Sequence, residues 1–223
     1  MRASINNMAS PVSFCRFARV YNFLEKLVFR EALEKTRFAC LDSISRSEKI
    51  LLLGEGDGRF LEKLTKVNPN CSVTVFDNSP TMLALAKTRV SSTFQGEVHF
   101  YKEDATNFPF SFEMFDAVVT HFFLDCFTEE TLSALLEKLS STLRSGGKWL
   151  IADFVEPSPN TLHSIPQFLC LRILYVFFRL TCGIEARSVI SPHKILRTLG
   201  LHESRSISFS KGFLTSLVFI KQA

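Results

Sequence analysis

Short apolar runs alternate with longer segments of helical period along most of the chain. The runs of strand length are 49–53, 72–76, 98–101, 115–120 and 148–153. Such alternation is typical of βαβ units, in which helices connect parallel strands. Two final runs, 204–209 and 214–221, flank Lys211-Gly212 and predict a terminal β-hairpin. We therefore expect a doubly wound α/β fold with a mostly parallel sheet of about seven strands and an antiparallel hairpin at its C-terminal end.

Helix boundaries are marked by capping residue types. Ser79-Pro80 supplies an N-cap followed by a proline at the first helical position. Thr128 precedes two acids, which favour a helix N-terminus. Leucines then recur at helical spacing from Leu132 to Leu143, and Gly146-Gly147 are expected to end that helix. The pattern also predicts helices over 59–67 and 192–199.

The chain has 223 residues and 46% hydrophobic composition, which suits one sizeable core. Apolar residues at helical spacing between 14 and 41 predict one or two helices before the first strand. We expect residues 1–44 to form an N-terminal helical extension or lid and residues 45–223 to form the main domain. Within that domain, 156–190 is interpreted as a substrate-side insertion.

The most apolar window runs from Phe168 to Cys182 and is interrupted by Arg172 and Arg179. It is shorter than the roughly 20 residues that span a bilayer. The window is therefore expected to be a buried helix or a pocket wall, and no transmembrane segment is predicted, although peripheral membrane contact stays open.

Charge and cysteine usage narrow the class of protein. The formal net charge is +4, but the basic residues are scattered among acids, so no nucleic-acid partner is indicated. The six cysteines form no CxxC pair and no Cys/His cluster, which favours a reduced, cytoplasmic protein without a bound metal. Polar residues through Ser13 interrupt the apolar region that a secretory signal would need.

Carboxylates follow most of the predicted strands. The segments expected at the strand ends are 54–58, Asp77, 103–105, 120–123 and Asp153. In an open α/β sheet, ligands bind outside the carboxyl ends of the strands. So many acceptor groups suit ribose hydroxyls, an amino group or a cationic centre better than several phosphates.

The loop Gly54-Glu55-Gly56-Asp57-Gly58 excludes two phosphate-binding motifs. A dinucleotide fingerprint needs GxGxxG, but Arg59 stands where the third glycine should be. Glu55 and Asp57 would also place negative charge beside the phosphates. A P-loop is excluded because no Gly-Lys-Ser/Thr follows.

An ordered series of motifs between 49 and 154 resembles the class I S-adenosylmethionine-dependent methyltransferases, whose fold is Rossmann-like. The glycine loop is similar to the family's first motif, and Val73 to Ser79 is similar to its acidic second strand. Glu103-Asp104-Ala105, the strand Phe115 to His121 and the turn Leu143 to Lys148 resemble the later motifs.

The resemblance implies S-adenosylmethionine as the cofactor and assigns roles to matching positions. Gly54, Gly56 and Gly58 would let the backbone approach the methionine portion and ribose. Asp77 would accept hydrogen bonds from the ribose hydroxyls. The adenine side would be formed by Asn78, Met82, Asp104 and Ala105, and the floor beneath the sulfonium by Thr120, His121 and Phe122.

One position departs from the family pattern. An acidic residue commonly stands two positions before the first loop glycine, where this chain has Leu52. Glu55, between the first two glycines, is a candidate for binding the ligand's ammonium group instead.

Methyl transfer is an in-line displacement, so alignment, desolvation and sometimes a base are what the protein must supply. His121 is the first candidate base because its ordinary pKa lies near neutrality. Asp153, Tyr21, Asp125 and His163 are weaker candidates. Three of the residues given a role in the site also have a purely structural interpretation. Asp77 could cap a helix or form a turn, His121 could satisfy a backbone carbonyl, and Asp125 could cap the next segment.

The many large apolar residues after the fifth strand, among 23 phenylalanines in all, favour a small lipophilic methyl acceptor. Quinone-like, polyketide-like and lipid molecules all fit this description. An inactive regulatory or scaffold protein that binds S-adenosylmethionine remains an alternative because of Leu52, Glu55 and Asp57. Oligomeric state is not predicted.

Overall fold

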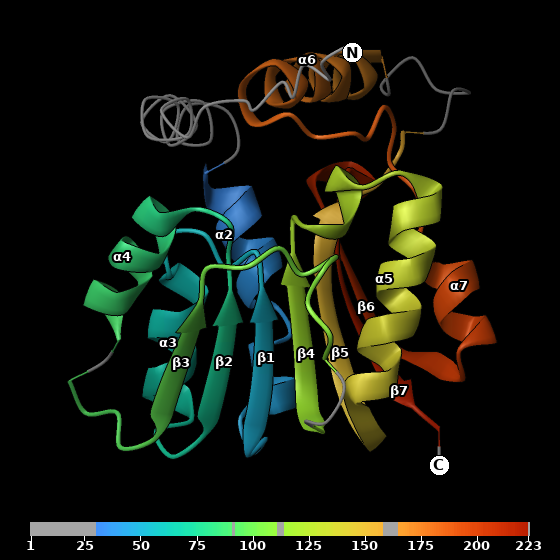
Figure 1. Cartoon of the computed structure of the whole chain (residues 1–223). Coiled ribbons are helices and arrows are strands. Elements are labelled where there is room, and N and C mark those ends of the chain that lie inside the picture. Colours follow the sequence, from blue (N-terminus) through green and yellow to red (C-terminus); the bar gives the residue numbers. More distant parts are fainter. Residues whose placement is uncertain (1–29, 91, 111–113, 158–164, 223) are drawn as a thin grey trace, which may run out of the picture.

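A seven-stranded mixed sheet forms the centre of the computed structural model, which describes residues 30–90, 92–110, 114–157 and 165–222 (Figure 1). The strand order is β3-β2-β1-β4-β5-β7-β6. The first five strands are parallel, and β7 is antiparallel to both β5 and β6. The strands are β1 (Lys49–Leu53), β2 (Ser72–Phe76), β3 (Glu97–Tyr101), β4 (Phe115–His121), β5 (Leu143–Phe154), β6 (Leu201–Phe209) and β7 (Leu214–Lys221). The predicted α/β fold with a C-terminal hairpin is confirmed.

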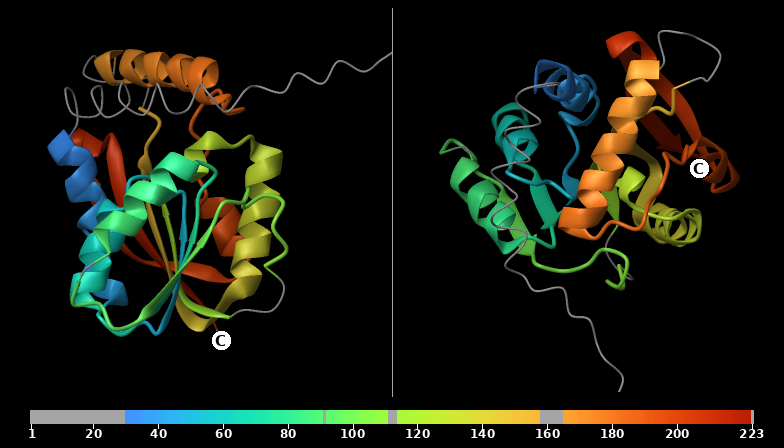
Figure 2. Two further views of the ribbon diagram at one scale, coloured as in Figure 1. Left: turned by 60° about the vertical axis from the view of Figure 1, so that its left-hand side comes forward. Right: turned by 90° about the horizontal axis from the view of Figure 1, so that it is seen from above.

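Helices cover both faces of the sheet (Figures 1 and 2). The α-helices are α2 (Arg30–Phe38), α3 (Arg59–Val67), α4 (Pro80–Arg89), α5 (Glu129–Thr142), α6 (Ile165–Cys182) and α7 (His193–Thr198). Short 3-10 turns lie at η1 (Leu41–Ile44), η2 (Leu124–Cys126) and η4 (Ser210–Gly212). Helices α5 and α7 pack on one face, and α2, α3 and α4 pack on the other.

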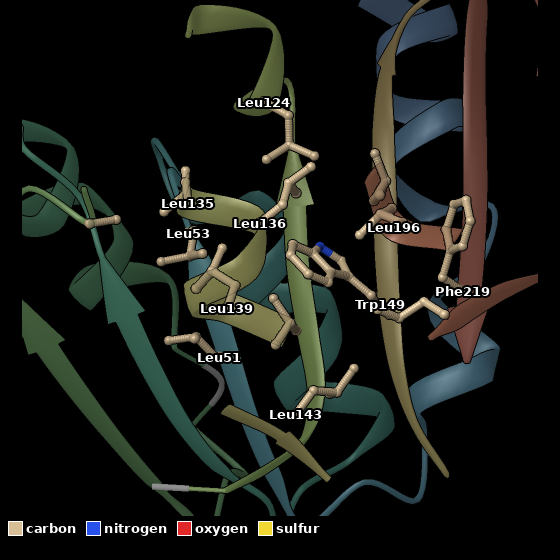
Figure 3. Close-up of a cluster of buried hydrophobic side chains, with 14 of the residues drawn as sticks. Leu51, Leu53, Leu124, Leu135, Leu136, Leu139, Leu143, Trp149, Leu196 and Phe219 are labelled. Carbon is tan, nitrogen blue, oxygen red and sulfur yellow. The ribbon is translucent and has the colours of Figure 1, made fainter. Parts of the chain in front are cut away.

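The last four residues of strand β1, Ile50 to Leu53, are all apolar and buried, whereas Lys49 at its start is exposed. Leu51 and Leu53 belong to the cluster under α5, whereas Ile50 and Leu52 belong to the cluster under α3 and α4. Alternate side chains point to opposite faces, and both faces are buried, so these four positions are all apolar. Figure 3 shows leucines of β1 and α5 packed beside Trp149 in the first of these clusters.

Both predicted N-caps are present. The Ser79 hydroxyl accepts a hydrogen bond from the backbone N of Met82 at 3.3 Å, and the Thr128 hydroxyl accepts one from that of Thr131 at 3.4 Å. The leucine-rich helix ends earlier than predicted, before Leu143 rather than at Gly146-Gly147. Helix α5 ends at Thr142, and Leu143 is extended and pairs with Phe115 of β4. Leu143 reaches the same apolar cluster from the strand, which explains its place in the leucine pattern.

Helix α6 lies across the carboxyl ends of the parallel strands, apart from the two helical layers (Figures 1 and 2). Leu171 and Tyr175 are buried, but six large apolar side chains of this helix are exposed. The expectation of a fully buried helix is therefore wrong, because only one side of α6 packs against the rest of the protein. Within the described ranges, no helix is both long and apolar enough to cross a bilayer.

Candidate functional site

The strand order reverses beside β1. The chain proceeds from β1 to β2 and β3 on one side and then returns to β4 and β5 on the other. Ligands of open α/β sheets bind at such a switch point, outside the carboxyl ends of the strands. The glycine loop 54–58 follows β1 directly and therefore lies at this point.

All three loop glycines have left-handed backbone conformations, with φ of 64°, 68° and 85° for Gly54, Gly56 and Gly58. A Cβ on Gly54 would lie 2.5 Å from the Phe123 ring, and one on Gly58 would lie 2.4 Å from the Cα of Ala86 in α4. A Cβ on Gly56 would meet nothing within 4 Å. The outer glycines thus permit close packing, and the middle one leaves its backbone open to a ligand.

Asp77 joins this loop to the start of α4. One carboxylate oxygen accepts a hydrogen bond from the backbone N of Gly56 at 3.0 Å, and the other accepts one from that of Ser79 at 2.8 Å. Burial raises the pKa of Asp77, and the two N–H donors oppose that rise. The side chain is partly exposed. Its carboxylate therefore has a fixed orientation at the edge where a ligand would bind.

The two acids between the glycines have different surroundings. Asp57 forms ion pairs with Arg59 at 2.9 Å and Arg89 at 3.3 Å, so its charge is compensated by α3 and α4. Glu55 accepts a hydrogen bond from the backbone N of Leu61 at 2.9 Å. Burial raises the pKa of Glu55 to about 7. The bond from Leu61 and the charge of Arg37 oppose this rise.

The residues predicted on the adenine side lie at the ends of β2 and β3. Asp104 is exposed, and one of its carboxylate oxygens accepts hydrogen bonds from the backbone N and the hydroxyl of Thr106, at 2.9 and 2.7 Å. Ala105 is buried, Asn78 is exposed and Met82 is partly exposed. In the described part of the chain, only Thr106 donates hydrogen bonds to the Asp104 carboxylate, both to the same oxygen.

Thr120, at the end of β4, does not face the site. It is fully buried, and its hydroxyl accepts a hydrogen bond from the indole N–H of Trp149 at 3.0 Å. The predicted role of Thr120 beneath the sulfonium is therefore wrong, because its side chain points into the core under α5.

The next two residues along the chain are His121 and Phe122. His121 is buried with its ring edge-on to Phe60, at 4.6 Å between centroids. Burial, and secondarily the charge of Arg37, lower the pKa of His121 well below its ordinary value. The imidazole is thus neutral and a weak base at physiological pH. Phe122 has a left-handed backbone with φ of 51°, and its backbone N donates to the Ala152 carbonyl at 2.7 Å.

Two carboxyl groups and a phenol meet near the ends of β4 and β5. Asp153 is buried, and one of its carboxylate oxygens accepts from the backbone N of Phe154 at 2.9 Å. Burial raises the pKa of Asp125 to about 6, whereas burial and the Asp125 charge raise that of Asp153 well above its usual range. The Tyr175 hydroxyl donates to the backbone carbonyl of Asp125 at 3.2 Å.

Sequence reasoning missed Tyr175, because only the fold brings α6 next to η2. The only available signal was its position in the apolar window. Tyr21 and His163, which were also considered as bases, lie outside the described residues.

A family model described as a methyltransferase domain matches residues 50–147, which include the glycine loop, Asp77 and Asp104. The ubiquinone/menaquinone biosynthesis C-methyltransferase UbiE of Blochmanniella floridana is 35% identical over 129 residues, 57% of this chain and 46% of that protein. Over this region the chain is similar to the class I S-adenosylmethionine-dependent methyltransferases. The recognition made from the motifs is confirmed.

Two other relatives match further parts of the chain. The UbiE protein of Pasteurella multocida is 27% identical over 133 residues, 59% of this chain and 49% of its own. That of Geobacter sulfurreducens is 25% identical over 204 residues, 90% of this chain and 78% of its own. The matched region spans about half the length of the first two relatives.

Solved structures share the methyltransferase fold. Human N-acetylserotonin methyltransferase in complex with S-adenosylmethionine superposes with a TM-score of 0.65 at 20% identity, over 96% of this chain and 57% of that one. Magnesium protoporphyrin IX methyltransferase from Synechocystis, with bound S-adenosylhomocysteine, gives 0.64 at 17% identity over 95% of both chains.

Proposed function

We propose that this protein binds S-adenosylmethionine and transfers its methyl group to a small lipophilic acceptor. The observation that carries the proposal is the fixed carboxylate of Asp77, held by Gly56 and Ser79 beside the open glycine loop. A carboxylate at the end of β2 suits the two hydroxyls of a ribose. The absence of a basic residue among the loop positions 54–58 favours a nucleoside without phosphates.

The remaining cofactor contacts are assigned around Asp77. Asn78, Met82, Asp104 and Ala105 would surround the adenine, with the second carboxylate oxygen of Asp104 accepting from the exocyclic amino group. Glu55 would bind the ammonium of the methionine portion. Gly54, Gly56 and Gly58 would give that portion close access to the backbone, with Phe122 nearby at the end of β4.

S-Adenosylmethionine supplies an activated methyl group, so the protein's task is to align the acceptor, exclude water and receive any proton that is lost. We place the proton acceptor at Asp153, supported by Asp125 and Tyr175. Burial raises the pKa of Asp153 well above its usual range and so makes its carboxylate a stronger base, whereas burial lowers the pKa of His121 and makes its imidazole a weaker one. His121 is then a neutral wall of the pocket, and Tyr21 remains a prediction.

The acceptor class rests on two supports. Several large apolar side chains lie beyond β5, on α6. The named relatives act, by their names, in ubiquinone and menaquinone biosynthesis as C-methyltransferases. We therefore favour a quinone-like ring as the acceptor and a carbon atom as the site of methylation, with polyketide-like and lipid acceptors as the other members of the test panel.

Calorimetry with S-adenosylmethionine and S-adenosylhomocysteine tests the cofactor assignment. Asp77→Ala should weaken both affinities about tenfold or more, because charge-assisted hydrogen bonds to the ribose are lost. Asp42→Ala is the matched control, since Asp42 is exposed and pairs with Arg205 away from the site. Undetectable cofactor binding by the wild type would refute the proposal.

Transfer of a labelled methyl group to demethylated quinones tests the acceptor. Labelling of an apolar quinone precursor but not of small polar phenols is the expected result. Cofactor binding without transfer to any member of a broad panel would instead favour a non-catalytic binding protein.

A further inference from the structure

Helix α6 is held to the rest of the protein along one side. The Gln167 side chain donates to the Ser210 carbonyl at 3.1 Å, and the Tyr175 hydroxyl donates to the Asp125 carbonyl. Leu171 and Tyr175 are buried in a cluster with Leu33 and with residues of the C-terminal hairpin region. Residues 167, 171 and 175 recur every four positions and define the inner face of the helix.

The opposite side carries an apolar stripe, which we name the outer face of α6. Its members are Ile165, Phe168, Leu169, Ile173, Val176 and Leu180, each between 45% and 83% exposed. They are six of the 11 large apolar side chains that are exposed among the described residues. Single exposed apolar residues are ordinary, whereas a contiguous set indicates an interaction surface.

The charges of α6 have one sign. The helix contains Arg172 and Arg179 and no acidic residue, and both arginines are exposed. They are seven residues apart and so project from the same flank of the stripe. The Arg172 guanidinium carbon lies 5.2 Å from the centre of the Phe168 ring, which places this cation beside the apolar stripe. An apolar face with a basic flank is typical of helices that lie in the membrane interface.

We propose that the outer face of α6 docks on a lipid bilayer that carries anionic headgroups. The helix would lie in the plane of the interface, its stripe in the acyl boundary and its arginines among the phosphates. An open hollow of about 410 Å³ at its C-terminal end, lined by Val176, Arg179, Leu180, Gly183 and Ile184, adds apolar surface beside one arginine.

Charge complementarity favours this occupant over two others. In a two-fold pairing of α6 with a second copy, each helix would bring two arginines and no carboxylate. The segment 14–28 of this chain has apolar residues at helical spacing, but it carries three basic residues and one acid. Neither surface neutralises Arg172 and Arg179, whereas anionic headgroups do.

The placement of α6 gives the docking a consequence for the site. The helix crosses the carboxyl end of the sheet, so that end would face the bilayer (Figures 1 and 2). A lipophilic acceptor could then pass from the acyl layer to the pocket without crossing bulk water. The docking itself does not depend on the proposed activity, because it rests on the exposed face and its charges alone.

Co-sedimentation of the full chain with vesicles tests the proposal. The protein should pellet with vesicles of phosphatidylcholine and phosphatidylglycerol and pellet less with phosphatidylcholine alone. Leu169→Gln combined with Ile173→Gln should lower binding about tenfold or more, because the apolar burial is lost. Arg172→Gln combined with Arg179→Gln should remove the preference for anionic vesicles. Leu85→Gln, an exposed leucine of α4, is the matched control and should bind as the wild type does.

Three outcomes would overturn the proposal. The wild-type chain fails to pellet with anionic vesicles, or the Leu169/Ile173 variant binds as well as the wild type. In the third, light scattering shows that the wild type is a dimer and the Leu169/Ile173 variant is a monomer, and neither protein binds vesicles. That result would assign the outer face of α6 to contact with a second copy of the chain. Calorimetry with S-adenosylmethionine on the same samples separates these results from a failure of the proposed function.

Discussion

The Glu55 carboxylate accepts a hydrogen bond from the backbone N of Leu61, 2.9 Å away, and so caps helix α3 from within the glycine loop. Leu61 lies in the first turn of α3, where backbone N–H groups have no partner inside the helix. This bond holds the carboxylate near the middle of the loop. Because burial raises the pKa of Glu55 to about 7, its charge changes within the physiological range.

If Glu55 binds the ligand's ammonium group, cofactor affinity should depend on its ionisation. Wild-type affinity for S-adenosylmethionine is then expected to rise between pH 6 and pH 8, as the carboxyl group loses its proton. Glu55→Gln should keep the bond to Leu61, bind about tenfold more weakly at pH 8 and show a smaller rise. Calorimetry at several pH values measures both effects. Equal affinities and equal pH profiles would remove Glu55 from the binding site.

Alanine substitutions at Gly58 and Gly56 form a matched pair that tests how closely the start of α3 packs against α4. Both have positive φ, so alanine costs about 1 to 2 kcal/mol of backbone strain at either position. At Gly58 the added Cβ also meets the backbone of Ala86 at 2.4 Å, whereas at Gly56 it meets nothing. Gly58→Ala should lower the free energy of unfolding by about 1 to 3 kcal/mol more than Gly56→Ala. Urea titration compares the two, and equal losses would contradict the close contact.

Thr120→Val should destabilise the fold without affecting cofactor affinity. Valine preserves the shape but removes the acceptor of the buried Trp149 N–H, which costs about 1 to 3 kcal/mol. Thr120→Ser keeps the hydroxyl and is the control for the acceptor. A large loss of cofactor affinity in a folded Thr120→Val protein would return Thr120 to the ligand pocket.

Asp125 should make stability fall as pH rises. Its pKa is about 6 in the folded protein against a usual 3.8, so the folded state holds the proton more tightly. This stabilisation is complete below about pH 4 and is lost as pH rises through 6. The free energy of unfolding of Asp125→Asn, relative to that of the wild type, should therefore be roughly 1 to 3 kcal/mol higher at pH 7 than at pH 4. Urea titrations at both pH values measure it, with exposed Asp42→Asn as the control, and a constant difference would contradict the assignment.

The sequence predicted the sheet well, because strands buried on both faces, such as β1, leave an uninterrupted apolar run between polar turns. Capping hydroxyls located the starts of α4 and α5 for a similarly local reason. The outer face of α6 escaped prediction because its stripe has the same residue types as its inner face. Only the fold shows which side meets the hairpin.

The placement of the candidate residues was predicted in part, whereas their roles in a site stay predictions. Asp77 and the glycine loop lie together because strand ends of a parallel sheet share one edge. Thr120 and His121 are neighbours in the sequence, but successive strand residues point to opposite faces. Thr120 therefore meets Trp149 while His121 meets Phe60. Tyr175 comes from a helix 50 residues beyond Asp125, and no local pattern links the two.

The paired hydrogen bonds of Asp77 also bear on the entropy of ligand binding. Asp77 ties Gly56 to Ser79 through bonds within the chain itself, so these two loops are fixed relative to each other without a contribution from a ligand. Ordering costs of this kind subtract directly from affinity. A ribose that binds at this edge therefore meets a preorganised acceptor, and most of the lost conformational freedom is its own.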